Sequence, residues 1–151
     1  MSRTQTLFVF LLLVVGGGLA IGFVTQPGQW YESLRKPWFN PPGWLFGPVW
    51  TMLYVMIAIA GWRIYQIAPK SGAMAAWAAQ LALNFLWSPV FFGAQRPGAA
   101  LIVLIALLAA IIAFIALSWP RDRLSAALFL PYAAWVSFAF LLNAAIWRLN
   151  G

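Results

Sequence analysis

The chain has 151 residues, of which 64% are hydrophobic and only 7% are charged. Soluble domains carry roughly a quarter charged residues, so this composition excludes an ordinary soluble domain and indicates an integral membrane protein. The net charge of +7 does not indicate a nucleic-acid partner, because the basic residues lie at the ends of apolar runs, where Lys and Arg meet lipid headgroups.

Five apolar runs are each long enough to cross a lipid bilayer as an α-helix, which takes about 20 residues. The alternating pattern of a transmembrane β-barrel is absent. We therefore predict an all-α integral membrane protein, a bundle of five transmembrane helices in a single domain over residues 1–151. Loop-type residues (Pro, Gly and charged side chains) separate the runs. The predicted spans are residues 6–24, 44–67, 73–92, 97–119 and 124–149.

The first run has two interpretations. Ser2 and Arg3, followed by the apolar residues 7–15, resemble the start of a cleaved signal peptide. No small-residue cleavage site of the usual kind follows, and Gly16–Gly18 leads into further apolar residues, so we favour a retained span. The orientation stays open, because five basic residues on the side of the N-terminus against four on the other side are too even a split for the positive-inside rule.

A polar and aromatic connection joins the first two spans, with the sequence WYESLRKPWFNPP at residues 30–42. Its three prolines fix φ and also restrain the residue before each of them. We therefore predict that residues 25–43 form a shaped lid instead of a slack tether.

Few residue types are available for chemistry. The chain has no Cys and no His, which excludes disulfides, Cys nucleophiles, His general bases and the common zinc and haem ligands. Its two carboxylates, Glu32 and Asp122, are predicted on opposite faces of the membrane and cannot form an acid–base pair. We therefore expect no metal site, no required cofactor and no conventional enzyme.

The third run carries a polar and aromatic stripe. Gln80, Asn84, Trp87, Ser88 and Phe91 recur at the period of one helical face. Amides within hydrocarbon need hydrogen-bond partners, so this face must look at protein or a cavity. It either makes interhelical hydrogen bonds, a common use of such residues in bundles, or forms a polar strip in an aromatic ligand pocket.

Two other runs carry aromatic residues that favour the pocket. Tyr132, Trp135, Ala139 and Asn143 share a face of the fifth run, where Pro131 is expected to kink the helix entry. The second run offers a similar face with Trp50, Tyr54, Ile57 and Gly61. A small-molecule site is typically an apolar, aromatic cavity with a few convergent polar groups. Three helices with such faces therefore favour the ligand pocket.

The first and fourth runs look structural. Residues 101–117 are almost purely aliphatic, and Gly16–Gly18 and Gly22 would let another helix approach closely. Small residues at four-residue spacing in the third run fit either intramolecular packing or a dimer contact. Three Trp residues near span ends fit the interfacial aromatic belt of membrane proteins. They are Trp62, Trp119 and Trp147.

Several of these segments together resemble the TspO/MBR family, the tryptophan-rich sensory proteins related to the translocator protein, also called the peripheral benzodiazepine receptor. The resemblance covers essentially the whole chain, and the ordered set of segments is specific although each one alone is weak. The segments are WYESLRKPWFNPP at residues 30–42, WTMLY at 50–54, QLALNFLWSP at 80–89, PYAAW at 131–135 and LN at 142–143.

The resemblance implies a five-helix bundle, often a homodimer, in the bacterial cell membrane, with a cavity closed by the loop after the first helix. It implies binding of porphyrins such as protoporphyrin IX and haem, with a role in tetrapyrrole transport, sensing or stress regulation. Alternatives are light- and oxygen-dependent porphyrin degradation, for which Trp50 and Trp135 would be the catalytic residues, and a non-catalytic membrane scaffold. The implied ligand-binding residues are Tyr31, Trp38, Trp50, Asn84, Trp87, Ser88, Phe91, Trp135 and Ala139.

Three details add to the resemblance. Arg35 and Lys36 carry charges suited to porphyrin propionates at the mouth of the cavity, an inference from charge and not from the family. Where the animal proteins have a Tyr in a cholesterol motif, this chain has Trp147 before Arg148, so high-affinity cholesterol binding is not expected. Without His, a porphyrin would be held through its faces and edges and not by the usual axial ligand to iron.

Overall fold

The computed structural model describes residues 1–151, and the chain is helical with no strand. Five helical segments are long and apolar enough to cross a membrane. They confirm the all-α class and the five predicted spans, with ends that differ from the predicted ones by at most three residues. The segments are Arg3–Val24, Gly43–Ile67, Gly72–Gly93, Pro97–Ser118 and Arg123–Asn150.

Three of the five spans are interrupted. The first consists of α1 (Arg3–Leu11), a π-helical turn and α2 (Gly17–Val24), and the third consists of α5 (Gly72–Ser88) followed by a π-helical turn that starts at Pro89. The last span breaks at Phe129 between α7 (Arg123–Leu128) and α8 (Leu130–Asn150). Proline lacks an N–H and clashes with the preceding turn, so Pro89 and Pro131 explain two of these breaks.

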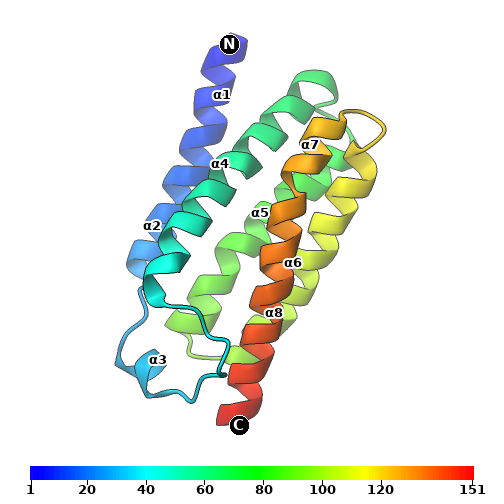
Figure 1. Ribbon diagram of the computed structural model, residues 1–151. Helices are drawn as coiled ribbons and strands as arrows, with labels where there is room; N and C mark the ends of the chain where they lie inside the picture. The colour runs from blue at the N-terminus through cyan, green and yellow to red at the C-terminus, as the bar shows by residue number, and fades with distance from the viewer.

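The second and fourth spans are continuous helices, α4 (Gly43–Ile67) and α6 (Pro97–Ser118). α6 packs along both α5 and α8, whereas α4 packs on α1 and on α7. α4 and the last span meet at α7 near the end that holds the N-terminus, and they diverge toward the other end (Figure 1). There the connection between α2 and α4, which contains the short helix α3 (Gln29–Ser33), crosses the bundle (Figure 1).

The core lies where the helices converge. Ile57, Ile64, Ile111 and Phe114 are fully buried there, and the Phe114 ring meets the Phe129 ring at 4.2 Å between centroids. The buried residues of α6 come from one side of the helix, while other aliphatic residues of α6 face outward. The fourth span thus packs on its neighbours with one side, in keeping with the structural role predicted for it.

Small residues bring helices close together in this core. Gly61 lies directly against the indole of Trp77, whose Nε1 donates a hydrogen bond of 2.9 Å to the carbonyl of Ile57. Gly18 lies against the ring of Tyr54, which confirms a packing role for this glycine of the first span. The same prediction is wrong for Gly22, because a Cβ there would have no neighbour within 4 Å.

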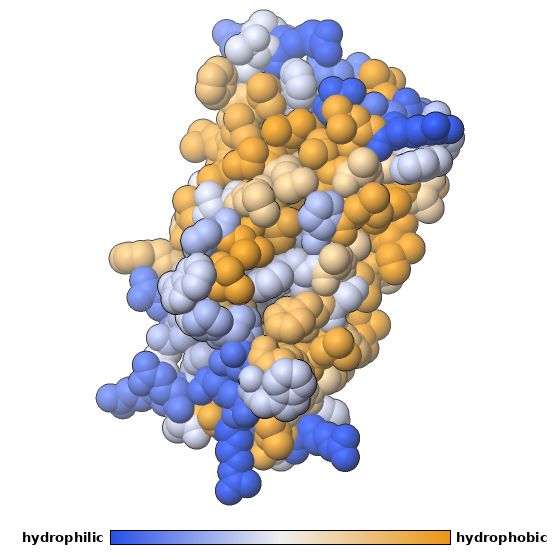
Figure 2. Space-filling model, viewed as in Figure 1, coloured by the Kyte–Doolittle hydropathy of each residue, from blue (hydrophilic) through white to orange (hydrophobic).

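The outer surface has the pattern of a membrane protein. On the face that Figure 2 shows, apolar residues form a broad band, and strongly hydrophilic residues gather at its two ends. Large apolar side chains such as Phe8, Leu12 and Ile102 are among those exposed in this band. The chain is therefore a multi-pass integral membrane protein, as predicted.

Candidate functional site

An aromatic seam lies between α4 and α8, in the half of the bundle where these helices diverge. It consists of Phe46 and Trp50 from α4 and Trp135 and Phe138 from α8. The ring of Trp135 is 5.8 Å from Phe46, 6.5 Å from Trp50 and 5.5 Å from Phe138, centroid to centroid. Residues three or four apart share a helix face, so each helix presents its two rings to the other.

The seam contains a hydrogen-bond donor that has no protein partner. The Nε1 of Trp135 is buried and donates to no protein atom. A buried donor without a partner costs about 1–3 kcal/mol, so such groups are rare unless a ligand or a function accounts for them. This N–H is therefore available to a hydrogen-bond acceptor that enters the seam.

A second aromatic group, the lid cluster, joins the connection before α4 to the end of α5. It consists of Trp30, Tyr31, Trp87, Phe91 and Phe92, with Phe91 almost fully buried. The Phe91 ring is 5.8 Å from Trp30, 6.2 Å from Tyr31 and 5.2 Å from Trp87, centroid to centroid. Burial raises the pKa of Tyr31, and its hydroxyl reaches toward Asn40 at 3.5 Å. The first part of the connection is thus packed on the end of the third span, mainly on the π-helical turn that follows α5.

The second part of the connection is tied to α8. The side chain of Asn150 accepts a hydrogen bond of 2.9 Å from the Arg35 backbone N–H and donates one of 2.8 Å to the Arg35 carbonyl. The ring of Phe39 meets Phe138 of the seam at 6.1 Å. The Lys36 ammonium lies 4.5 Å over the Tyr31 ring. These contacts give the connection a defined course across the end of the bundle.

The polar stripe of α5 bonds to α8 in the core. Asn84 donates a hydrogen bond of 2.6 Å to the Tyr132 hydroxyl, which donates one of 2.8 Å to Oε1 of Gln80. All three side chains are buried. Gln80 and Asn84 thus make interhelical hydrogen bonds, the first of the two interpretations of the stripe. Tyr132 also links this network to the seam, since its ring lies 6.4 Å from Trp50.

Three further hydrogen bonds hold the C-terminal end of α5 and the segments beside it. The Trp87 indole donates a hydrogen bond of 3.0 Å to Asn143 of α8, and Asn143 donates one of 2.8 Å to the Pro97 carbonyl at the start of α6. The Ser88 hydroxyl lies 2.5 Å from that of Thr25 at the end of the first span. These groups fix the helices that surround the seam and the lid cluster.

The predicted ligand residues fall into separate places. Trp50 and Trp135 meet in the seam, with Ala139 one turn further along α8, while Tyr31, Trp87 and Phe91 form part of the lid cluster. Asn84 and Ser88 bond to neighbouring helices. Trp38 belongs to neither group: it is 94% exposed and meets the ring of Phe39.

Sequence reasoning missed two residues of the seam. Phe46 precedes Trp50 by four residues, and Phe138 follows Trp135 by three. The helical period that selected the two tryptophans would also have selected these rings. It could not have found Asn150, whose partner Arg35 is 115 residues away in the chain.

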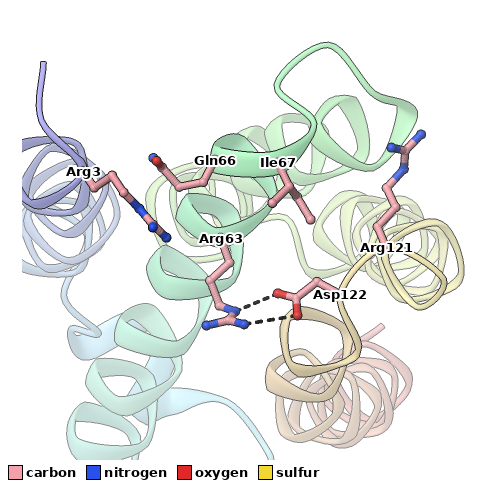
Figure 3. A pocket seen from close by; sticks show the side chains of 6 residues that line it. All are labelled: Arg3, Arg63, Gln66, Ile67, Arg121 and Asp122. Atoms are coloured by element: carbon pink, nitrogen blue, oxygen red, sulfur yellow. Dashed lines mark hydrogen bonds and ion pairs between the residues drawn. The ribbon is translucent and has the colours of Figure 1, made fainter.

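Two open hollows lie at the ends of the bundle and not in the seam. One, of about 430 Å³, lies at the lid end between Trp30, Trp147 and the start of α6. The other, of about 180 Å³, lies at the N-terminal end between α1, α4 and the loop that joins α6 to α7 (Figure 3). No group of three or more His, Cys, Asp or Glu side chains could hold a metal ion.

These features define a class of protein: a helical, multi-pass membrane protein with an aromatic seam between its helices. The sequence model of the TspO/MBR family matches residues 9–148. The chain therefore belongs to the TspO/MBR family, which confirms the resemblance read from its motifs.

Relatives with similar sequences extend across bacteria, archaea and mammals. Protein CrtK of Rhodobacter capsulatus is 39% identical over 149 residues, which cover 96% of this chain and 93% of that protein. The tryptophan-rich protein TspO of Archaeoglobus fulgidus is 43% identical over 148 residues, 93% of this chain and 94% of that protein. The translocator protein of Sus scrofa is 38% identical over 146 residues, 90% of this chain and 84% of that protein. At the family level, the role is that of a sensory or translocator protein of the membrane.

Proposed function

We propose that the chain binds a planar, hydrophobic tetrapyrrole such as protoporphyrin IX or haem in the aromatic seam, as a receptor or carrier in tetrapyrrole transport, sensing or stress regulation. The observation that carries this proposal is the buried, unpartnered N–H of Trp135 among the rings of Phe46, Trp50 and Phe138. The rings offer apolar contact to the faces of a macrocycle, and the N–H offers a hydrogen bond to an acceptor on it.

The other predicted residues take supporting roles in this proposal. Tyr31, Trp87 and Phe91 of the lid cluster close the end of the seam, and Ala139 leaves room for the ligand beside Trp135. Asn84 and Ser88 do not contact the ligand in this proposal. Asn84 bonds to Tyr132 and Ser88 bonds to Thr25, and these bonds hold the helices around the seam in place. Trp38 contacts the ligand only if the connection folds further over it, because its ring is exposed.

The arrangement supports downhill transfer or sensing more than pumping. Proton and ion pathways through membranes usually need ionisable groups within the span. The seam has none, and the charges nearest to the ligand would be Arg35 and Lys36 on the connection. Lys36 sits over Tyr31 at the lid cluster, where it could meet a propionate group of a porphyrin.

The test is a titration of the protein in nanodiscs with protoporphyrin IX, read from the shift of the Soret absorption band. We expect saturable binding, and about a tenfold higher Kd for Trp135→Phe, since one hydrogen bond and part of the aromatic contact together contribute about 1.4 kcal/mol. Trp119→Phe, which changes an exposed tryptophan outside the seam, is the matched control and should bind like the wild type. Unsaturable partitioning in all three proteins would refute the proposal.

A second candidate function is light-driven degradation of the porphyrin. Trp50 and Trp135 lie 6.5 Å apart, centroid to centroid, so both indoles could contact a bound porphyrin. The photoexcited porphyrin would take an electron from one indole, molecular oxygen would add to the reduced macrocycle, and the electron would return to the tryptophan radical cation, so that the net change is the addition of O2 to the porphyrin. Illumination in the presence of oxygen should then bleach the bound porphyrin faster than porphyrin in protein-free nanodiscs. Equal bleaching, or bleaching unchanged in Trp135→Phe, would leave binding as the function.

The proposal includes a homodimer. Ala75, Ala78, Ala79 and Ala82 form an exposed stripe of small residues on α5, the type of surface through which membrane helices approach closely. Ala79→Trp should shift the protein to monomer in chemical crosslinking within nanodiscs, whereas Ala106→Trp on the exposed side of α6 should not. A wild type that does not crosslink would contradict the dimer.

A further inference from the structure

Trp38, on the connection between the first two spans, has a side chain that is 94% exposed, the largest exposed fraction among the large apolar residues of the chain. Trp38 and Phe39 are the central residues of a turn. A hydrogen bond of 3.1 Å from the Asn40 N–H to the Pro37 carbonyl closes this turn. Phe39 is partly buried, and its ring meets Phe138 of the seam at 6.1 Å. The turn therefore directs one ring into the protein and the other ring away from it.

This turn lies at the level where α4 begins. Phe46, in the first turn of α4, meets Trp135 of α8, and Phe39 meets Phe138, which is on the next turn of α8. The last turns of α8 extend well beyond the start of α4 (Figure 1). Because Trp38 adjoins Phe39, its ring is close to the level of the start of α4 and not to that of the end of α8.

The start of α4 coincides with one boundary of the hydrocarbon layer. No charged residue lies between Gly43 and Arg63, and this part of the helix rises about 30 Å at about 1.5 Å per residue. The rise equals the thickness of the hydrocarbon core of a bilayer, about 30 Å. Arg63 pairs with Asp122 at the N-terminal end of the bundle, which marks one boundary. Gly43, and with it Trp38, then lies at the opposite boundary.

The protein surface at this level faces lipid. Trp44, in the first turn of α4, is 74% exposed, and Met52 and Val55 follow on the same exposed face of the helix. Tryptophan collects where hydrocarbon meets headgroups, because its ring is apolar and its N–H is polar. Arg35 is exposed on the same connection and suits a layer of headgroups. The surface around Trp38 is thus continuous with the lipid-facing band.

We propose that Trp38 binds the lipid bilayer itself, with its indole inserted at the boundary between acyl chains and headgroups. Phe39 holds the same turn to the seam from the inside. The connection is therefore fastened on two sides, to the protein through Phe39 and to the membrane through Trp38. Trp38 has a lipid partner in place of the ligand contact that the family resemblance implied. This anchor does not depend on the proposed tetrapyrrole binding, because contact with lipid needs no ligand.

The first test measures the depth of position 38 in nanodiscs. The chain has no Cys, so Trp38→Cys can carry a single nitroxide label, whose collisions with oxygen and with a water-soluble nickel chelate report its depth. Leu12→Cys, at an exposed position in the middle of the first span, is the lipid reference, and Lys70→Cys, on an exposed loop, is the aqueous reference. We expect the ratio of oxygen to nickel collisions at Trp38→Cys to lie between the two references. A ratio equal to that of Lys70→Cys would overturn the proposal.

The second test uses the natural indole. Hydrogen exchange of the Arg35 amide, which bonds to Asn150, reports how often the connection opens. Trp38→Ser should raise this exchange rate about tenfold in nanodiscs, because partial burial of a large apolar ring shifts the balance between closed and open connection by about that factor. Trp38→Phe should give an intermediate rate. Trp119→Ser, at an exposed tryptophan of the opposite end, is the matched control and should exchange like the wild type.

The two tests must agree. An exchange rate in Trp38→Ser equal to that of the wild type would overturn the anchor, even if the label at this position were in lipid. The same increase in Trp119→Ser would also overturn it, because the effect would then not belong to the connection.

Discussion

The two halves of the bundle are built on different chemistry. In the half that holds the N-terminus, α4 meets α7 and the core is mainly aliphatic, with a few aromatic rings and with glycines that let rings pack against neighbouring helices. In the other half α4 and α8 diverge, and aromatic rings, amide hydrogen bonds and an unpartnered indole N–H lie between the helices (Figure 1). Mutations should therefore affect stability and ligand binding separately, according to the half in which they lie.

The largest expected effect is in the convergent half. Phe114→Ala should lower the free energy of unfolding by about 3 kcal/mol or more, because Phe114 is fully buried against Phe129 and its removal leaves a cavity. Thermal unfolding in detergent measures this, and the Kd for protoporphyrin IX of the folded protein should stay unchanged. Phe8→Ala, at a ring that is 65% exposed toward lipid, is the control and should change stability little.

The same variant tests whether the two halves are independent. If Phe114→Ala raised the Kd for protoporphyrin IX as much as Trp135→Phe does, the two halves would form one energetic unit. The assignment of ligand binding to the divergent half would then be wrong.

A smaller effect is expected at the hydrogen bonds that hold the connection to α8. Asn150→Ala removes both bonds to the Arg35 backbone, while Asn150→Asp keeps the acceptor and loses the donor. Because both bonds are exposed to solvent, together they should stabilise the closed position of the connection by about 1 kcal/mol. Asn150→Ala should therefore speed protoporphyrin release about fivefold. Stopped-flow dissociation measures the rate, and Asn150→Asp should give an intermediate value.

The control for this series is Ser137→Ala, which removes an exposed hydroxyl of α8 that bonds only within its own helix. It should leave the release rate unchanged. Identical rates for Asn150→Ala and the wild type would show that the connection does not gate the seam, and the term lid would no longer apply.

The sequence was sufficient for the spans but not for the division of the bundle into halves. Long apolar runs dominate a membrane fold, because backbone groups in lipid must bond within a helix. Whether α4 and α8 converge or diverge depends on interruptions of the helices, such as the one at Phe129 before Pro131. The amino-acid composition of a span does not determine the angle of such an interruption. The polar stripe of α5 likewise had two interpretations until Tyr132 was seen between Gln80 and Asn84.

The smallest expected effect depends on pH and belongs to the convergent half. The Arg63 guanidinium beside Asp122 lowers the pKa of that carboxyl below its ordinary value, with Ser125 contributing a further hydrogen bond. A carboxyl whose pKa is lower in the folded protein than in the unfolded chain stabilises the fold above the unfolded pKa. That stability is lost as the pH falls through the lower, folded value. Stability should therefore decline below about pH 4.

The ion pair links α4 to the loop before α7, so its loss should loosen the point where the two helices meet. It is partly exposed to solvent, and such pairs contribute about 1 kcal/mol or less, and less still at high salt. Asp122→Asn should thus lower the unfolding temperature slightly at pH 7 and remove this part of the acid dependence, whereas Glu32→Gln on the exposed connection should do neither. If Asp122→Asn changed porphyrin release but not the unfolding temperature, the ion pair would influence ligand binding in the divergent half. The assignment of stability to one half and of ligand binding to the other would then be wrong.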